Sequence, residues 1–310
     1  MNPKSNGVLG IVPVIPTPFD RHQRVDCGAL EPLIEFAVHA GVKAVCTPAY
    51  GSEFYKLSIE ERSGLVDAAV KFARGRVQVV GQANHPSPRF AAELARRNQD
   101  LGAAIVSFAL PRQFEYPEES MLRYAAQVAR CVQVPVLVQD FNPGGPSVGA
   151  CFARKLKEAA PNFCYLKLEE PSMGPKVRAI RKSTGGEVGV LEGWGGMYII
   201  ELANDGVVGA MPGLAMSDLF VRIFCKIQDG DLAGAARIHR SMLPQIGLAL
   251  RNMELFHHCE KLLLAARGLL RSTVVRDPSV EPDEQMLDHI GLVNRLVLEE
   301  VERNGVTSRL

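Results

Sequence analysis

Lys167 is the side chain whose surroundings in the sequence point most directly to chemistry. It lies in the run Phe-Cys-Tyr-Leu-Lys-Leu at residues 163–168, which is otherwise apolar enough to be buried. Burial among apolar side chains disfavours the charged form of an amine, and the neutral amine is the nucleophile that forms a Schiff base with a ketone. The sequence equally allows a structural role, in which Lys167 ends a strand and reaches water or pairs with Glu169.

Two further segments carry polar groups that suit a small anionic substrate. Residues 49–53 read Ala-Tyr-Gly-Ser-Glu, whose small residues leave backbone amides open to a carboxylate, with the hydroxyls of Tyr50 and Ser52 alongside. The pair Gln139 and Asp140 closes an apolar run before a loop rich in Gly and Pro, where it is placed to hold a substrate. Each segment also has a structural interpretation, the first as an ordinary loop and the second as a satisfied polar strand end.

Three other patterns contain reactive residue types in unfavourable arrangements. Glu169 and Glu170 are neighbours on one strand and point to opposite faces, so a paired-carboxylate site of the glycosidase kind is not expected. The segment Glu-Gly-Trp-Gly-Gly at residues 192–196 would suit a phosphate but brings no cation of its own. In His-His-Cys-Glu at residues 257–260, adjacent helical side chains diverge by about 100° and cannot converge on a metal ion. No metal site and no cofactor are expected.

Eight short apolar runs must supply the strands that position these groups. Each run is nearly continuous rather than alternating, which is typical of strands buried on both faces of a parallel sheet. Intervals of roughly 20 to 35 residues leave room for one helix and two loops between successive runs. The runs are residues 9–15, 42–47, 77–82, 104–109, 134–140, 163–168, 188–193 and 207–211.

Helical periodicity fills the intervals between these runs. Ser58 and Glu61 form a capping box, which satisfies free amides at a helix start, and apolar positions after Asp26 recur on one helical face. Further helices are expected over residues 87–101, 117–131, 149–160, 174–182 and 196–204. Eight strand–helix units without a polar linker favour an α/β fold of the (β/α)8 TIM-barrel type over two smaller α/β domains split near residues 143–146.

After residue 211 the strand signals cease and only helical periodicity remains. Helices are expected over residues 218–228, 232–250, 255–270 and 282–304, with a break at Arg-Asp-Pro over residues 276–278. We therefore expect a barrel domain over residues 1–216 and a C-terminal α-helical extension over residues 217–310. In a barrel of this kind chemistry takes place at the carboxyl ends of the strands, where the polar segments described above fall.

Bulk properties exclude several classes of function. The 310 residues include 35 Lys and Arg against 34 Asp and Glu, so the formal charge of +1 offers no global field to attract nucleic acid or a membrane surface. No apolar run approaches the ~18 residues of a membrane span, and the first six residues lack the apolar core of a signal peptide. Seven scattered cysteines without Cys-x-x-Cys spacing suit reduced thiols, which favours a cytoplasmic protein.

The order of these segments resembles the dihydrodipicolinate synthase and N-acetylneuraminate lyase superfamily, the class I lyases that form Schiff bases. The resemblance covers nearly the whole chain and implies a barrel with a C-terminal helical domain, assembled as a homotetramer from a pair of dimers. The matching segments are Val-Pro-Val-Ile-Pro-Thr-Pro-Phe at 12–19 with Val25-Asp26, Gly-Ser-Glu at 51–53, Leu57-Ser58 with Glu-Glu-Arg at 60–62, Pro135-Val136, Lys167, and Gly-Val-Val-Gly-Ala-Met at 206–211.

The resemblance also implies roles for individual residues. By position, Lys167 resembles the lysine that forms the imine with pyruvate or another 2-keto acid. The loop of Tyr50, Gly51 and Ser52 falls where the family binds the keto-acid carboxylate, and Met211 resembles the residue whose backbone contacts the bound keto acid.

Several departures from the synthases bear on the reaction. Their carboxylate loop reads Gly-Thr-Thr-Gly-Glu, whereas residues 49–53 here lack both threonines. Their proton-shuttling tyrosine at the end of strand five stands in a Tyr-Asn pair, which is replaced by Gln139 and Asp140, and the tyrosine lent across the dimer aligns near Gln113. The synthase arginine that binds the aldehyde substrate's carboxylate has no counterpart in residues 142–147. A glutamine does not ionise near neutral pH, so it cannot rebuild a tyrosine relay.

The chain is more similar to branches that act on 2-keto-3-deoxy sugar acids, especially the 2-keto-3-deoxyarabonate dehydratases. The similarity rests on Val-Gln-Asp at 138–140, Leu-Lys-Leu-Glu at 166–169 and the segment at 192–196. In this hypothesis Lys167 forms a protonated imine, an electron sink that eases either loss of a C3 proton or cleavage of the C3–C4 bond. Tyr50, Glu169 or a water held by Gln139 and Asp140 would supply the acid–base function.

Two alternatives remain open at this stage. One is 4-hydroxy-tetrahydrodipicolinate synthase, and the other is a barrel that binds a keto acid without catalysis. Both keep a small-molecule 2-keto acid as the partner, and none of these hypotheses involves nucleic acid or a membrane.

Overall fold

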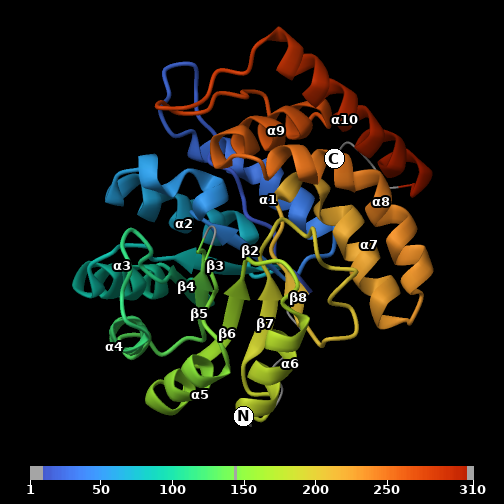
Figure 1. Ribbon diagram of the computed structural model, residues 1–310. Coiled ribbons are helices and arrows are strands. Elements are labelled where there is room, and N and C mark those ends of the chain that lie inside the picture. Colours follow the sequence, from blue (N-terminus) through green and yellow to red (C-terminus); the bar gives the residue numbers. More distant parts are fainter. Residues whose placement is uncertain (1–9, 143–144, 306–310) are drawn as a thin grey trace.

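An eight-stranded parallel sheet forms the centre of the computed structural model, which describes residues 10–142 and 145–305 (Figure 1). Hydrogen-bonded neighbours follow the order β1-β8-β7-β6-β5-β4-β3-β2. Beyond β1, Val14 forms a parallel bridge with Cys46 of β2, which joins the two edges of the sheet. The TIM-barrel prediction is therefore confirmed. The strands are β1 (Gly10–Ile11), β2 (Ala44–Thr47), β3 (Gln78–Gln82), β4 (Ile105–Ala109), β5 (Val136–Asp140), β6 (Phe163–Leu168), β7 (Gly189–Glu192) and β8 (Gly209–Ala210).

Helices cover the outside of the barrel where most of the periodicity predicted them. Ser58 caps α2 as expected, since its Oγ accepts from the N–H of Glu61 at 3.2 Å and Oε2 of Glu61 accepts from the N–H of Ser58 at 2.9 Å. Within the described part of the chain, no helix combines the length and apolarity needed to cross a bilayer. The barrel helices are α1 (Leu30–His39), α2 (Ile59–Ala73), α3 (Pro88–Asp100), α4 (Glu118–Ala129), α5 (Ala150–Ala159), α6 (Gly174–Ser183) and α7 (Ser217–Gln228).

The prediction of a helix over residues 196–204 is wrong, because these residues form a series of turns between β7 and β8. Their backbone hydrogen bonds differ in span: the N–H of Ile199 bonds to the carbonyl of Gly196, three residues back, and that of Leu202 bonds to the carbonyl of Tyr198, four residues back. Gly195 and Gly196 adopt φ values of 63° and 83°, which lie in the left-handed region. The glycines therefore begin the segment in a conformation that a right-handed helix cannot use.

Alternation along the strands decides which side chains enter the barrel. Gln139, Lys167 and Leu191 are register partners on β5, β6 and β7, so they share the inner face. Asp140 and Glu192 each follow one residue later and therefore face away from the interior of the barrel.

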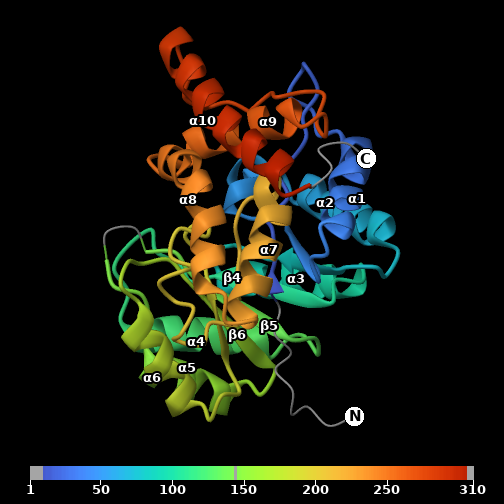
Figure 2. The same ribbon diagram turned by 90° about the vertical axis from the view of Figure 1, so that its right-hand side faces the viewer.

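The C-terminal helices share a core with the barrel. Ile11 of β1, Leu33 of α1 and Phe220 of α7 belong to one apolar cluster, which continues into Ile238 of α8 and Leu263 of α9. Helix α7 follows β8 and packs beside β1, so the domain boundary proposed at residues 216/217 falls at its first residue. Figures 1 and 2 show α9 and α10 together at one end of the molecule, towards which the arrowheads of β6 and β7 point. The extension consists of α8 (Leu232–Ala249), α9 (Met253–Ala266) and α10 (Glu284–Arg303).

Candidate active site

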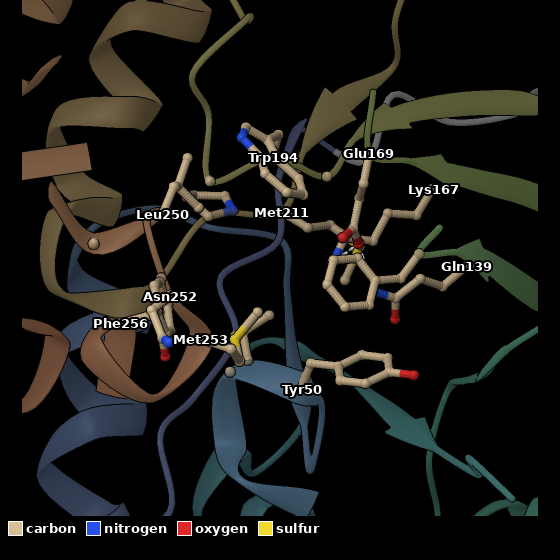
Figure 3. A pocket seen from close by; sticks show the side chains of 18 of the residues that line it. Tyr50, Gln139, Lys167, Glu169, Trp194, Met211, Leu250, Asn252, Met253 and Phe256 are labelled. Atoms are coloured by element: carbon tan, nitrogen blue, oxygen red, sulfur yellow. Dashed lines mark hydrogen bonds and ion pairs between the residues drawn. The ribbon is translucent and has the colours of Figure 1, made fainter. Parts of the chain in front are cut away.

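A cavity of about 280 Å³ lies where the carboxyl ends of the strands meet the segment between α8 and α9. In Figure 3 the side chains of Gln139, Lys167 and Glu169 lie on one side of this cavity. Leu250 and Met253, at the junction of α8 and α9, lie on the other side. A cavity of this size is suited to a small metabolite.

Lys167 and Glu169 form an ion pair in the cavity wall. The two residues are two positions apart at the end of β6 and therefore project from the same face. Nζ of Lys167 lies 3.0 Å from Oε1 of Glu169, and the two residues are 6% and 9% exposed. The sequence left open whether Lys167 lines a site or pairs with Glu169, and in the structure it does both.

Gly193 provides the space that this pair occupies. A Cβ atom at residue 193 would lie 2.5 Å from Cγ of Glu169 and 2.7 Å from Cε of Lys167, well inside the roughly 3.5–4 Å at which carbon atoms pack. Any larger residue here would displace the ion pair. The glycines of this segment suggested phosphate binding, and a single sequence contains no signal for a glycine that makes room for a neighbouring strand.

A chain of side-chain amides orients Glu169. Nε2 of Gln82, on β3, donates to Oε1 of Gln139 at 2.7 Å, and Nε2 of Gln139 donates to Oε1 of Glu169. Gln82 and Gln139 are each 2% exposed. Sequence reasoning missed Gln82, although a polar residue that closes a buried strand is a usable signal. Because an amide does not ionise, this chain positions the carboxylate rather than transferring protons.

The two ionisable oxygen acids of the cavity differ in strength. Burial raises the pKa of Glu169, while the charge of Lys167 and the hydrogen bonds from Lys167 and Gln139 oppose the rise. A carboxyl shifted towards neutral pH is suited to general acid–base work. Burial, and to a smaller extent the charge of Glu169, raises the pKa of Tyr50 to about 12, so this phenol stays protonated at neutral pH.

Tyr50 and Gly51 belong to a short 3₁₀ turn, Tyr50–Ser52, that follows β2 and lines the cavity. The ring centroid of Tyr50 lies 4.9 Å from that of Phe141. A Cβ atom on Gly51 would lie 3.0 Å from Phe256 of α9 and 3.1 Å from Val14. The turn is therefore held between the barrel and the C-terminal extension.

Ser52 does not reach the cavity, although the sequence suggested that its hydroxyl would face a carboxylate. The residue is fully buried. Its Oγ donates to the carbonyl of Ile15 at 2.5 Å and accepts from the N–H of Ala49 at 2.9 Å. The hydroxyl thus stabilises the turn itself.

Asp140 is also placed outside the cavity. Its carboxylate accepts from Nε and Nη2 of Arg112 at 2.8 and 2.6 Å, and from the N–H of Val148 at 2.7 Å. Because Asp140 follows Gln139 directly, strand alternation turns it towards the helices. The substrate-binding role expected for Asp140 does not fit this geometry, and Asp140 instead connects two βα loops.

Met211 lines the cavity at the end of β8. Its backbone N–H donates to the carbonyl of Glu192 at 2.8 Å and is therefore committed to the strand pairing. The carboxylate of Glu192 accepts from the N–H groups of Trp194 and Gly196 at 3.0 and 2.8 Å, and burial raises the pKa of Glu192 to about 7. These amides, which a phosphate would need, are thus occupied by the chain's own carboxyl group.

The histidines of residues 257–260 face different partners. Nε2 of His257 lies 3.0 Å from Oη of Tyr55, whereas Nε2 of His258 lies 2.9 Å from the carbonyl of Val280. Across residues 10–142 and 145–305 there is no group of three or more His, Cys, Asp or Glu side chains that could hold a metal ion.

The wall contributed by the segment between α8 and α9 was missed by sequence reasoning. Leu250, Arg251, Asn252 and Met253 all line the cavity. They lie far from Lys167 in the sequence and belong to no recognisable motif, so only the packing of the extension against the barrel brings them to the site.

Comparisons with known proteins match most of the chain to one protein family. A model of the Dihydrodipicolinate synthetase family matches residues 7–293. L-2-keto-3-deoxyarabonate dehydratase from Azospirillum brasilense is 29% identical over 279 residues, which cover 88% of this chain and 89% of that protein. A probable 2-dehydro-3-deoxy-D-pentonate aldolase from Escherichia coli K12 is 26% identical over 286 residues, which cover 91% and 94%. A 4-hydroxy-tetrahydrodipicolinate synthase from Methanocaldococcus jannaschii is 26% identical over 239 residues, which cover 76% and 81%.

Solved structures show the same fold. Dihydrodipicolinate synthase from Rhodopseudomonas palustris has a TM-score of 0.87 at 23% identity and covers 96% of this chain and 99% of its own. A prophage protein of the dihydrodipicolinic acid synthase family from E. coli K12, in complex with pyruvate, has a TM-score of 0.81 at 23% identity and covers 94% and 98%.

Proposed function

The chain belongs to the dihydrodipicolinate synthetase family, and from this premise we propose that it is a lyase that forms a Schiff base between Lys167 and a 2-keto-3-deoxy sugar acid. The reaction that we favour is dehydration of this substrate, and aldol cleavage through the same imine is the second candidate. Pyruvate, the shortest 2-keto acid that the site would accept, serves as a probe of imine formation.

The observation that carries this proposal is the placement of one amine beside one carboxyl group in the cavity wall. Nζ of Lys167 is 3.0 Å from Oε1 of Glu169. Among the described residues that line the cavity, Glu169 is the one carboxyl group. Proton transfers to and from the amine or the substrate therefore fall to Glu169 in our proposal.

The proposed steps follow from this placement. The neutral amine of Lys167 attacks the C2 ketone, and the carbinolamine loses water to give a protonated imine. Glu169 takes a proton from C3, and the electron pair moves into the imine to give an enamine. The enamine expels the C4 hydroxyl, which leaves as water with the proton held by Glu169, and an unsaturated imine remains. Hydrolysis releases an unsaturated 5-hydroxy-2-keto acid, and tautomerisation of this acid gives the semialdehyde. In the aldolase alternative the C4 hydroxyl is deprotonated and the C3–C4 bond breaks, which releases a two-carbon aldehyde and leaves an enamine. Protonation of the enamine at C3 and hydrolysis of the resulting imine give pyruvate and restore the amine of Lys167.

Gln139 argues against the synthase alternative. At this position the synthases use a tyrosine whose hydroxyl shuttles protons, and an amide that donates to Glu169 has no proton to pass on. The relative named L-2-keto-3-deoxyarabonate dehydratase, at 29% identity, supports the choice of 2-keto-3-deoxy acids. The relative named as a pentonate aldolase supports the same substrate class but not the same outcome.

The remaining features of the proposal concern binding and assembly. Gly51 and Met211 contact the bound keto acid in this scheme, and Tyr50 closes the cavity below it. Assembly as a homotetramer and residence in the cytoplasm stay predictions. One structural relative is described as a monomeric dihydrodipicolinate synthase variant. Light scattering of the purified protein would test whether this chain assembles as a homotetramer.

A product assay tests the proposed reaction. Purified protein is incubated with a 2-keto-3-deoxypentonate, and the products are identified by mass spectrometry. A semialdehyde that has lost one water supports the dehydratase, and pyruvate with a two-carbon aldehyde supports the aldolase. Borohydride should inactivate the protein only when the keto acid is present. An unchanged substrate together with resistance to borohydride would contradict the proposal and would favour a barrel that binds without catalysis.

A further inference from the structure

Residues 193–196, called the glycine turn below, follow β7 and form the part of the cavity wall next to the reactive pair. Gly193, Trp194 and Gly195 line the cavity. Carbon atoms of Lys167 and Glu169 fill the space that a Cβ atom on Gly193 would need. The position of the glycine turn therefore limits where the amine and the carboxyl group can lie.

Two buried side chains form hydrogen bonds with Gly196, the last residue of the glycine turn. The carboxylate of Glu192 accepts from the N–H of Gly196 at 2.8 Å. The carbonyl of Gly196 accepts from Nε2 of His239 at 2.9 Å and from the N–H of Ile199 at 3.3 Å. Glu192 is completely buried, and His239 is 5% exposed. Gly196 is thus held on one side by β7 and on the other side by α8 of the C-terminal extension.

The hydrogen bond from His239 requires one protonation state of its ring. A carbonyl oxygen only accepts, so Nε2 carries the proton. Burial lowers the pKa of His239, and the bond to Gly196 opposes this shift only in part, so the ring is neutral at pH 7. The ring centroid of Phe220 lies 6.4 Å from that of His239, and a Cβ atom on Gly196 would overlap the Phe220 ring. The imidazole is therefore a donor that α8 directs at the glycine turn.

We propose that His239 is a positioning residue for the reaction, because its hydrogen bond to Gly196 keeps the glycine turn packed against Lys167 and Glu169. His239 is not among the described residues that line the cavity, so it acts through the turn rather than on the substrate. Without this donor, the turn would move and leave space into which Glu169 shifts away from C3 of the substrate. A misplacement of about 1 Å can lower a rate by about 10²-fold. This inference rests on the proposed function, since it concerns the proton transfers assigned to Glu169.

The first test replaces His239 by leucine and by glutamine. Leucine removes the donor, whereas Nε2 of a glutamine can reach the position of Nε2 of the imidazole. Turnover of a 2-keto-3-deoxypentonate is measured per site that pyruvate and borohydride trap, so that unfolded protein is not counted. His239→Leu should lower kcat about tenfold and change KM less than about threefold, because Glu169 loses its alignment while Gly51 and Met211 keep theirs. His239→Gln should stay within about threefold of the wild-type kcat.

Trp194 provides a second readout, because it is the single tryptophan of the chain and belongs to the glycine turn. Quenching of its fluorescence by acrylamide should increase in His239→Leu and keep the wild-type value in His239→Gln. This measurement needs no turnover. Failure of the proposed function would appear as a wild-type protein that pyruvate and borohydride do not trap, and the fluorescence comparison would still test the hydrogen bond.

The control is His258→Leu, which removes a comparable contact elsewhere in the extension. Nε2 of His258 lies 2.9 Å from the carbonyl of Val280, and His258 does not line the cavity. This variant should keep the wild-type kcat and quenching. If His239→Leu does not fold, His239→Asn replaces it, because the shorter amide does not reach Gly196.

Two results would overturn the inference. One is a wild-type kcat together with wild-type quenching in the variant that lacks the donor at residue 239. The other is an equal loss of kcat in that variant and in His239→Gln, because the hydrogen bond would then not be the cause.

Discussion

Two buried pairs of lysine and glutamate in this protein share their chemistry and differ in their surroundings. Lys261 of α9 places Nζ 2.6 Å from Oε1 of Glu53, and both side chains are completely buried. Nζ of Lys261 also donates to the carbonyl of Val274 at 2.7 Å and lies 4.5 Å from the ring centroid of Phe19. By contrast, Nζ of Lys167 has Glu169 as its one partner among the described residues, and its remaining surroundings open into the cavity.

This difference shows which property of a buried lysine suits it to react. Burial lowers the pKa of Lys261 to about 8, yet no part of this side chain lines the cavity. A depressed pKa therefore does not identify a nucleophile without access for a ketone. Lys167 combines burial, a proton acceptor and adjacent space, whereas the donors of Lys261 are used to join the extension to the barrel.

The largest expected effect separates the two lysines by activity. Lys167→Met should abolish imine trapping and turnover, because the attacking atom is gone. Lys261→Met should keep turnover within about threefold of the wild type, since it alters no atom that touches the substrate. Rates are measured with the protein shown to be folded by circular dichroism. Equal loss of turnover in both folded variants would remove the distinction between the pairs.

Substitution of Glu169 should lower the activity more than substitution of Glu53, but by less than the loss of Lys167 does. Glu169→Gln should lower kcat by about 10²–10⁴, the usual contribution of a general acid–base group, while Glu53→Gln should leave kcat nearly unchanged. Because burial raises the pKa of Glu169, the acidic limb of the wild-type kcat profile should lie above the ordinary carboxyl value of 4.5. This limb should disappear in Glu169→Gln. A limb that persists there would assign the titration to another group.

The two lysine substitutions should affect stability in the opposite order: Lys261→Met should destabilise the protein more than Lys167→Met. In Lys261→Met the buried carboxylate of Glu53 keeps one charged side chain, that of Lys56, within 4 Å. The free energy of unfolding, measured in urea, should therefore fall by about 3 kcal/mol. Lys167→Met should change the unfolding free energy by less than about 1 kcal/mol, because Glu169 can take up a proton and borders the cavity. Adding Glu53→Gln to Lys261→Met should recover part of the loss. A larger loss in Lys167→Met than in Lys261→Met would reverse the roles.

A further expected effect on stability is a pH dependence that belongs to Lys261. Its pKa is about 8 in the folded chain against an ordinary 10.5, so between these pH values the unfolded chain binds more protons. The unfolding free energy therefore rises with pH in this window. The difference between wild type and Lys261→Met isolates this contribution and should increase from pH 8 towards 10.5. A difference that decreases over the same range would show that the folded protein favours the charged amine.

The sequence supported the barrel well because its signals are local. Continuous apolar runs and the capping box at Ser58 each depend on neighbouring residues, and both predicted elements that the structure contains. The prediction of a helix over residues 196–204 failed because Gly195 and Gly196 adopt left-handed φ values, and periodicity does not register these values.

The sequence allowed site residues to be predicted at the strand ends but not in the C-terminal extension. Lys167, Glu169 and Gln139 follow from the rule that barrel chemistry lies at the carboxyl ends of strands. Asp140 was misplaced because adjacent strand residues face opposite ways, and register is needed to say which one enters the barrel. Arg251 was missed because its position depends on how the extension packs, which no local pattern records.

The most direct test of the account is to locate the adduct formed with pyruvate and borohydride. Wild-type protein is reduced in the presence of pyruvate, digested, and mapped by peptide mass spectrometry, with Lys167→Met and Lys261→Met treated in parallel. We expect one reduced adduct, on Lys167, in the wild type and in Lys261→Met, and none in Lys167→Met. An adduct on Lys261, or trapping that persists in Lys167→Met, would contradict the assignment of Lys167 as the nucleophile.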